Sequence, residues 1–338
     1  MRNDLLITPV DHPNFSQDNY LFNNMAYLLE QQNRTWELCA KNYEALNNVK
    51  VKKFYFDDTF EVKVQFNPAR VISSTAKVDA NSIKERKCFL CHNHLPSIQK
   101  GFLYKNEYLV LVNPYPIFQQ HFTIPHINHI PQSIFEKLGD MLDLSNDLDL
   151  HYVVFYNGPK CGASAPDHFH FQAGQRNFMP IDNDFDFILD KYVIDSYNYN
   201  DIAIYVIGEK YLRPHFMIIS HNKEKIIQSF EKLYNSMKTT DEEPLMNILV
   251  YRVIFKGELV WRVVIFPRKK HRPDCYFAED ETRLVVSPAS VDIGGVLITP
   301  FENDFDKITK EHIKNIYAEV TLSDDEILSL YKNFINKN

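Results

Sequence analysis

The chain has 338 residues, of which 45% are hydrophobic and 14% are aromatic. This composition excludes a disordered chain and gives enough apolar side chains for one large domain or two of ordinary size. The formal net charge of -7 argues against a general nucleic-acid binder, which would carry an excess of Lys and Arg, but it leaves room for a local basic pocket around a nucleotide phosphate.

The N-terminal residues and the cysteines bear on the compartment of the protein. Residues 1–15 lack the basic region and the continuous apolar run of a signal peptide. No segment approaches the roughly 18 apolar residues of a membrane span. The five cysteines form an odd, sparse set, which is typical of reduced thiols. We therefore expect a cytoplasmic protein without a membrane partner.

The chain is predicted to begin with helical structure and to continue with a strand pair. Residues 15–48 carry apolar side chains at helical spacing without an interrupting Pro or Gly, which predicts one long helix or two consecutive ones that serve as a packing arm. Residues 51–78 alternate apolar and polar side chains, which predicts two strands joined by a turn at Asp57 and Asp58.

Strands and one helix are predicted in the next segment. Residues 102–112 are typical of a second strand pair, and residues 131–149 of a helix with Pro131 in its first turn. Residues 151–158 and 168–174 are predicted to be strands, and the turn between them contains glycine. This segment therefore combines sheet and helix.

A similar order of elements recurs in the second half of the chain. Residues 201–220 predict two strands, residues 223–237 a helix, and residues 246–268 a hairpin. Two helices are predicted at 302–320 and 323–338. The second of these begins with a serine followed three residues later by a glutamate, which is the pattern of a capping box.

This repeated order predicts an α+β fold of two halves, each built on an antiparallel sheet with packed helices. A helical N-terminal extension precedes the halves, and C-terminal helices complete the second one. The expected boundaries are residues 1–50 for the extension, 51–195 for the first half and 196–338 for the second. The first half carries most of the polar motifs, so we expect it to be catalytic and the second half to be degenerate.

One stretch of the first half, residues 157–174, joins a turn of small residues to a motif of two histidines and a glutamine. His168, His170 and Gln172 are separated from one another by single phenylalanines. Because alternate side chains of a β-strand point to opposite faces, the phenylalanines are expected to enter the core. The three polar side chains are then expected to line a site.

A histidine on such a strand is suited to covalent catalysis at phosphorus. A neutral imidazole attacks a phosphate, and the resulting phosphoramidate passes the group to a second acceptor. Gln172 faces the same way as His170 and is expected to hydrogen-bond a phosphate oxygen. The turn that contains Gly162 and Ser164 offers backbone N–H groups and a hydroxyl. The competing interpretation is that the histidines are metal ligands or ordinary core residues.

The stretch 162–172 resembles the active-site strand of the histidine-triad superfamily, specifically its transferase branch with a His-x-His-x-Gln motif. That branch includes galactose-1-phosphate uridylyltransferases, diadenosine tetraphosphate phosphorylases and GDP-hexose phosphorylases, and within it the chain is most similar to a bacterial family. Further similar segments follow in the same order, at residues 64–71, 112–134 and 287–323. The resemblance implies two histidine-triad-like halves that form an internal pseudo-dimer.

The resemblance also implies roles for individual residues. His170 matches the histidine that becomes nucleotidylated, and Gln172 matches the glutamine that assists it. Asn157 and Ser164 match polar positions that contact the phosphates, and Arg70 matches an arginine near the nucleotide. A transferase of this branch would thus be expected to bind its substrate with residues from several segments.

A structural zinc ion is a further implication. Cys88 and Cys91 have the C-x-x-C spacing of half a tetrahedral site, and zinc-containing members of the branch place such a pair at this point in the chain. His168 matches a histidine that ligates zinc in those members, and His121 or His129 is expected to be the fourth ligand. Histidines next to the cysteine pair compete as local ligands, and two reduced cysteines without metal are the alternative.

The strongest basic cluster follows the last predicted strand of the second half. Arg268 and Lys270 are expected to steer phosphate toward a site, and a solvated loop at a strand end is an equal alternative. Arg213 and His215 are weaker candidates of the same kind. The chain has neither a Walker loop nor a dinucleotide-binding fingerprint.

Together, the motifs and the resemblance predict nucleotidyl transfer without an organic cofactor. The expected substrate is a nucleoside diphosphate sugar or a dinucleoside polyphosphate, which His170 attacks at the α-phosphate. The expected acceptor is inorganic phosphate or a sugar phosphate, and phosphorolysis fits the C-terminal resemblance better than exchange. The alternatives are a nucleotide hydrolase and a non-catalytic nucleotide-binding regulator. No nucleic-acid partner is expected, and both a monomer and a homodimer fit.

Overall fold

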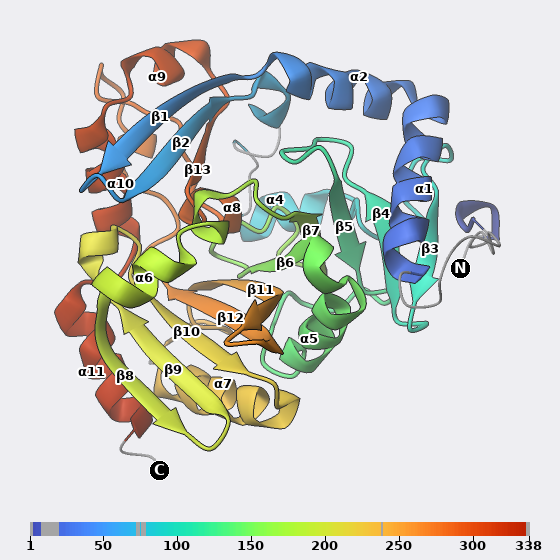
Figure 1. Ribbon diagram of the computed structural model, residues 1–338. Coiled ribbons are helices and arrows are strands. Elements are labelled where there is room, and N and C mark those ends of the chain that lie inside the picture. Colours follow the sequence, from blue (N-terminus) through green and yellow to red (C-terminus); the bar gives the residue numbers. More distant parts are fainter. Residues whose placement is uncertain (1–2, 8–19, 72–74, 76–78, 238, 336–338) are drawn as a thin grey trace.

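The computed structural model of the chain describes residues 3–7, 20–71, 75, 79–237 and 239–335. A ten-stranded antiparallel sheet forms its centre, a three-stranded sheet lies on one side of it, and helices pack on both of its faces (Figure 1). This arrangement confirms the predicted α+β fold. None of the helices in the described ranges has both the length and the apolar character that are needed to cross a membrane.

The N-terminal segment forms helices α1 (Tyr20–Thr35) and α2 (Glu37–Ala45), so of the two predicted alternatives, one long helix or two consecutive ones, the structure has the second. The part of the predicted helix before Tyr20 lies outside the described residues. The exposed side of α2 carries Glu37, Leu38 and Lys41, while Cys39 and Tyr43 are buried. This amphipathic spacing is what the sequence pattern indicated.

The predicted strand pair that follows is β1 (Lys50–Phe56) and β2 (Phe60–Phe66), and the turn residues Asp57 and Asp58 have positive φ angles of 48° and 52°. Aspartate tolerates this conformation better than most residues. Strand β2 also pairs in parallel with β13 (Val296–Thr299), so the three-stranded sheet joins the two ends of the chain.

The central sheet contains the same order of elements twice. The first set is β3 (Gly101–Tyr104), β4 (Tyr108–Val112), β5 (His121–Pro125), α5 (Leu138–Asp147), β6 (Tyr152–Asn157) and β7 (His170–Gln175). The second set is β8 (Val193–Tyr199), β9 (Ile202–Ile207), β10 (His215–Ser220), α7 (Lys223–Ser236), β11 (Met246–Phe255) and β12 (Glu258–Pro267). The sheet order is β3-β4-β5-β7-β6-β11-β12-β10-β9-β8. The strands of the second set therefore stand in the reverse order of the corresponding strands of the first set, and β6 and β11 pair where the two sets meet. The second set begins at Val193, so the expected boundary at 195 falls inside β8.

Helix α5 is shorter than the predicted helix over residues 131–149, because it begins at Leu138. The residues before it run beside the approach to β7, where the Phe169 N–H donates to the Ile130 carbonyl at 2.7 Å. This pairing with a distant segment holds the chain around Pro131 in a non-helical conformation. Tertiary hydrogen bonds thus override the helical spacing of the apolar residues.

Further helices of the described residues are α4 (Ala80–Glu85), α6 (Phe185–Lys191), α8 (Ser290–Ile293), α9 (Glu302–Lys307), α10 (Lys310–Val320) and α11 (Asp324–Ile335). The predicted helix over 302–320 is therefore two helices, and the side chain of Thr309 caps the second one. The capping box at the start of α11 is confirmed. The Ser323 N–H donates to the Glu326 carboxylate at 2.7 Å, and the Glu326 N–H donates to the Ser323 hydroxyl at 3.4 Å.

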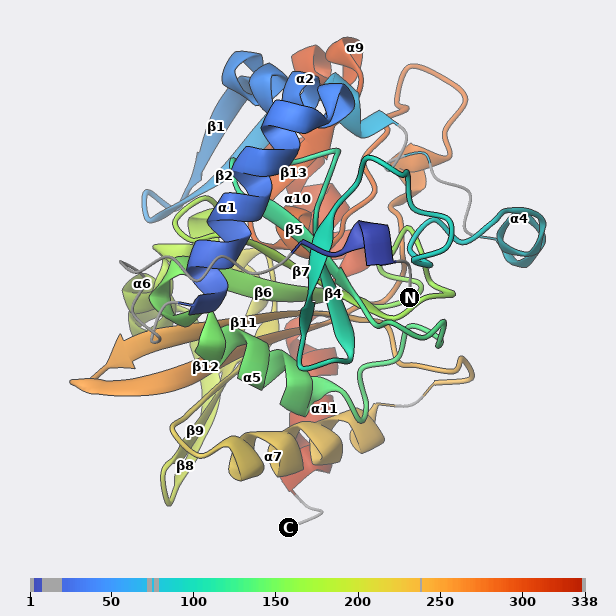
Figure 2. The same cartoon turned by 90° about the vertical axis from the view of Figure 1, so that its right-hand side faces the viewer.

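Separate cores lie on the two faces of the central sheet. Phe169 and Phe171 are buried in one core with α1, α5, α7 and α11, as their alternation with polar residues predicted. The other core joins the opposite face to β2, β13, α8 and α10. Figure 2 shows the three-stranded sheet on one side of the central sheet, with α5 and α7 on the other. The polar side chains of β7 therefore face the side that carries the three-stranded sheet.

Candidate active site

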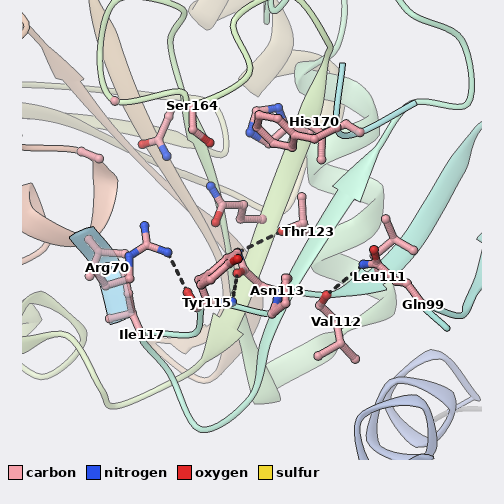
Figure 3. A pocket seen from close by; sticks show the side chains of 18 of the residues that line it. Arg70, Gln99, Leu111, Val112, Asn113, Tyr115, Ile117, Thr123, Ser164 and His170 are labelled. Carbon is pink, nitrogen blue, oxygen red and sulfur yellow. Dashed lines mark hydrogen bonds between the residues drawn. The ribbon is translucent and has the colours of Figure 1, made fainter. Parts of the chain in front are cut away.

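A cavity of about 870 Å³ lies between strands β4 to β7 of the central sheet, β13 and α8 (Figure 3). Its volume is in the range of small-molecule binding sites. Apolar side chains from α2, β4 and the segment between α4 and β3 form part of its wall. All the residues that we expected to contact the substrate line it: Arg70, Asn157, Gly162, Ser164, His170 and Gln172.

The protonation state of His170 follows from its hydrogen bond. Its Nδ1 lies 2.9 Å from the His168 carbonyl oxygen, which accepts but does not donate, so Nδ1 carries the proton. Burial lowers the pKa of His170 to about 4, which keeps the imidazole neutral near pH 7. Its Nε2 therefore has a free lone pair, and no described residue hydrogen-bonds it. A neutral, unprotonated ring nitrogen at a cavity wall is chemically competent for nucleophilic attack.

Gln172 is oriented by His121, on the neighbouring strand β5. The Ile117 N–H donates to Nδ1 of His121 at 3.1 Å, so the proton of this neutral ring lies on Nε2. Burial lowers the pKa of His121 to about 3, which keeps the ring neutral. Nε2 then donates to Oε1 of Gln172 at 2.9 Å. The amide group of Gln172 consequently presents its NH₂ group to the cavity.

Arg70 brings a positive charge to the cavity beside a buried carboxyl group. Its Nη1 donates to the Tyr115 carbonyl at 2.7 Å (Figure 3). Asp292 of α8 also lines the cavity, and burial raises its pKa to about 6, an effect that the Arg70 charge opposes. Asp292 was not among the site residues predicted from the sequence. The only sequence signal for it was its place in the segment 287–323, which resembles the transferase branch.

The turn between β6 and β7 depends on Gly162. Its φ angle is +94°, and a Cβ atom there would lie 2.4 Å from Cβ of Ala289. The glycine therefore permits both the backbone conformation and the close approach to the segment that precedes α8. Ser164 follows in the same turn and lines the cavity near His170 (Figure 3).

His168 does not lie on the strand that carries His170 and Gln172, contrary to our expectation. It precedes β7 in a bend, and its Nε2 donates to the His126 carbonyl at 2.8 Å. Its Nδ1 is therefore unprotonated and faces away from the cavity, toward Cys88 at 3.3 Å. Only two of the three polar side chains of the motif share the cavity face, because the regular strand begins at His170.

The unprotonated nitrogen of His168 belongs to a cluster of four ligand groups. Atoms of Cys88, Cys91, His129 and His168 lie within 4.8 Å of one another. Cys91 Sγ is 3.2 Å from His129 Nδ1 and 3.5 Å from His168 Nδ1. A tetrahedral zinc site separates its sulfur and nitrogen ligands by about 3.5 Å. The donor set and the spacing therefore fit zinc. His121, the other expected ligand, is not in the cluster because it binds Gln172.

The basic candidates of the second half do not line the cavity among the described residues. Arg268 is buried behind the wall and donates to other protein groups. Lys270 pairs with Asp274 at 2.5 Å and with Glu319 at 2.7 Å. Arg213 and His215 are fully buried.

Two family models match the chain. Residues 28–175 match a domain of unknown function, DUF4922, and residues 216–337 match a family described as the GDPGP1-like C-terminal domain. No curated protein sequence matches the chain. The second match covers α7, β11, β12 and the C-terminal helices, which include the α8 wall of the cavity.

Three solved structures of yeast Ap4A phosphorylase Apa2 are similar to this fold. The complex with AMP is 16% identical with a TM-score of 0.50, over 82% of this chain and 92% of that one. The complex with Ap4A is 15% identical with a TM-score of 0.52, over 82% and 94%. The structure without a named ligand is 15% identical with a TM-score of 0.51, over 85% and 94%. The chain thus shares its fold with an Ap4A phosphorylase and matches a GDPGP1-like domain in its C-terminal part, in agreement with the resemblance described from the sequence.

Proposed function

We propose that the chain is a nucleotidyltransferase that acts at the α-phosphate of a nucleoside diphosphate sugar or a dinucleoside polyphosphate. The observation that carries the proposal is the free Nε2 of a neutral His170 in a cavity with hydrogen-bond donors around it. The fold shared with an Ap4A phosphorylase whose structures contain AMP and Ap4A supports a nucleotide substrate. The GDPGP1-like domain supports phosphorolysis.

In the first step, the Nε2 lone pair of His170 forms a bond to the α-phosphorus. The bond from this phosphorus to the bridging oxygen breaks, and a sugar phosphate or a nucleotide leaves with the electron pair. The proton on Nδ1 stays in its hydrogen bond to the His168 carbonyl, which stabilises the positive charge on the ring. The NH₂ group of Gln172 and the Arg70 guanidinium are the groups that we assign to the phosphate oxygens.

In the second step, an oxygen of inorganic phosphate attacks the same phosphorus and the P–N bond breaks. The electron pair returns to Nε2, so His170 is again neutral and ready for another cycle. The product is a nucleoside diphosphate. A sugar phosphate as the acceptor would give exchange and water would give hydrolysis, through the same intermediate.

We also propose that Cys88, Cys91, His129 and His168 hold a zinc ion. Such an ion supplies rigidity when bound, because a closed four-ligand site leaves no position for substrate. The carbonyl of His168 accepts the Nδ1 proton of His170, so fixing this ligand also fixes the orientation of the nucleophile. No bond that forms or breaks in the reaction is assigned to the ion.

The test is covalent labelling with nucleotides that carry ³²P at the α-phosphate, offered as NDP-sugars and dinucleoside polyphosphates. The label on the wild-type chain should be acid-labile and alkali-stable, as expected for a phosphoramidate. Inorganic phosphate should release it as a nucleoside diphosphate. His170→Gly should abolish labelling and lower turnover by several orders of magnitude. Turnover within tenfold of wild type in this variant would remove His170 from the role.

A further inference from the structure

Asn157 ends strand β6 at the wall of the cavity, and its amide orientation is fixed by groups behind the wall. Its Oδ1 accepts hydrogen bonds from the Ser290 N–H at 2.8 Å and from Nδ2 of Asn247 at 3.0 Å. A backbone N–H only donates, so the oxygen of Asn157 points away from the cavity. Its Nδ2 donates to no described residue and is left for the cavity that Asn157 lines.

Asn247, which is paired with Asn157 across strands β11 and β6, is itself held in one orientation. Its Oδ1 accepts from Nη1 of Arg268 at 2.5 Å, and its Nδ2 donates to the Cys161 carbonyl at 2.8 Å. A guanidinium only donates and a carbonyl only accepts, so both contacts require the same assignment of oxygen and nitrogen. Asn247 and the Ser290 N–H therefore require the same orientation of Asn157.

Arg268 is the anchor of this chain of hydrogen bonds. Its side chain is buried, and each of its five N–H groups has a protein acceptor. The acceptors are the carbonyls of Val320 at 2.9 Å, Pro288 at 3.1 Å, His271 at 3.1 Å and Lys270 at 3.3 Å, with Oδ1 of Asn247. No N–H of Arg268 is left for a ligand. Its positive charge instead polarises the two amides in series, which makes the outer N–H group of Asn157 a stronger donor.

We infer that Arg268 and Asn247 are positioning residues that hold the NH₂ group of Asn157 toward the α-phosphate. The inference rests on the proposed function, because it takes an anionic group to lie beside His170. With Gln172 oriented by His121, both amides near the nucleophile then present donors. An amide that turned its oxygen to the cavity would repel phosphate oxygens. The orientation that Arg268 and Asn247 impose therefore decides whether Asn157 attracts or repels the phosphate.

Asn247→Asp tests this orientation with almost no change in shape. One carboxylate oxygen keeps the hydrogen bond from Arg268, and the other now faces Oδ1 of Asn157. Because two acceptors cannot pair, the amide of Asn157 should give up its hydrogen bond from the Ser290 N–H, donate to the charged and therefore stronger acceptor Asp at 247, and turn its oxygen to the cavity. Loss of a donor to a charged group corresponds to about a tenfold to hundredfold rise in the Kd of AMP, GMP or UMP, measured by calorimetry.

The same measurement in an Asn157→Ala background separates positioning from a general structural effect. If Asn247 acts through the amide of Asn157, then Asn247→Asp should change the Kd there by less than about threefold, because coupled residues are not additive. An equal loss of affinity in both backgrounds would overturn the inference, as would unchanged affinity in Asn247→Asp with Asn157 present.

Two further measurements keep the outcomes distinct. The melting temperature reports whether Asn247→Asp folds, and its new ion pair with Arg268 should keep the variant folded. If it does not fold, Asn247→Ala removes the restraint without adding an acceptor, and the same comparison of backgrounds applies. Wild-type protein that neither binds these nucleotides nor becomes labelled refutes the proposed function itself. Wild-type binding with no coupling between Asn247 and Asn157 refutes only the positioning.

Discussion

Two buried histidines near the cavity carry their protons on different ring nitrogens, and this difference separates their functions. His170 keeps its proton on Nδ1, against the His168 carbonyl, so that Nε2 faces the cavity with a lone pair. His121 has its proton on Nε2, because the Ile117 N–H occupies its Nδ1. In the mechanism that we propose, His170 is the nucleophile, and His121 is a donor that orients Gln172.

The lowered pKa of His170 predicts the pH dependence of covalent labelling. Burial favours the neutral ring and lowers its pKa to about 4, so the nucleophilic form persists below the pH at which an ordinary histidine is half protonated. At saturating nucleotide, the rate constant of labelling should be constant from pH 8 to about pH 5 and should fall only at lower pH. Rapid-quench measurements across this range check the prediction. A fall that is centred near pH 6.5 would contradict it.

The roles of some site residues could be predicted from the sequence, and those of others could not. His170 and Gln172 are two residues apart on a strand, so the period of two places them on one face. Arg268 follows a strand in a basic run, which is typical of an exposed loop. Its burial depends on carbonyls of Val320 and Pro288, which are remote in sequence. A local pattern cannot predict acceptors that only the tertiary fold brings together.

At the scale of elements, the connection between β6 and β7 places the phosphate-facing turn against the segment before α8. The contact requires a glycine, because a Cβ at Gly162 would lie 2.9 Å from the backbone Cα of Ala289. The contact with Ala289 therefore fixes the loop that carries Ser164 against the C-terminal part of the chain.

Gly162→Ala should disturb this turn. The variant combines an unfavourable φ of +94° with the clash against Ala289, so we expect a loss of about 1–3 kcal/mol in the free energy of unfolding and weaker nucleotide binding. Urea denaturation and calorimetry measure the two effects. Gly257→Ala is the matched control, because its φ is +84° but no atom lies within 4 Å. The control should show the cost of the φ angle alone, and equal weakening of nucleotide binding in both variants would contradict the prediction.

The order of strands and helices could be predicted because each element has its own hydrophobic period. The start of α5 could not be, because the residues before it pair with the approach to β7 through the Ile130 carbonyl. Strand β8 was missed for a different reason. It is an edge strand in which most side chains are exposed, so its sequence lacks the apolar alternation of a half-buried strand.

At the scale of the whole molecule, the two repeats share a sheet but differ in chemistry. Strands β5 and β10 both begin with His-Phe, at His121 and His215. Four residues further on, Pro125 is paired with His170 of β7, whereas Ile219 is paired with Arg262 of β12. Arg262 thus occupies in the second repeat the place of His170, the proposed nucleophile. A guanidinium has no lone pair to offer a phosphate at neutral pH, so this repeat cannot form the intermediate.

This asymmetry predicts one nucleotidyl group per chain. Incubation with an NDP-sugar or a dinucleoside polyphosphate without an acceptor should shift the intact mass by a single nucleotidyl unit. The shift should vanish in His170→Gly and persist in His215→Asn, which alters the buried histidine of the second repeat. A second unit, or a label that survives the loss of His170, would show that another side chain reacts.

The Cys/His cluster joins segments that lie far apart in the sequence, so a metal bound there is expected to stabilise the whole fold. Cys88 and Cys91 belong to the segment that also carries Phe89 and Leu90 of the cavity wall, while His168 lies next to β7. The purified protein should therefore contain about one zinc per chain in a tetrahedral S₂N₂ site. Elemental analysis and X-ray absorption at the zinc edge measure the content and the ligands.

Removing one ligand should lower stability before it alters the chemical step. Cys88→Ser and His168→Asn should lose the metal and lower the melting temperature by several degrees, because the bound ion stabilises only the folded chain. Both variants should still become labelled at His170 to some extent, since the His168 carbonyl belongs to the backbone and remains in place. Cys275→Ser, which lies outside the cluster, should keep the zinc and the melting temperature. If the wild-type protein contains no metal and the ligand variants melt at the same temperature as the wild type, then Cys88 and Cys91 are ordinary thiols. A His168→Asn variant that keeps its metal but cannot be labelled would instead give His168 a direct part in the reaction.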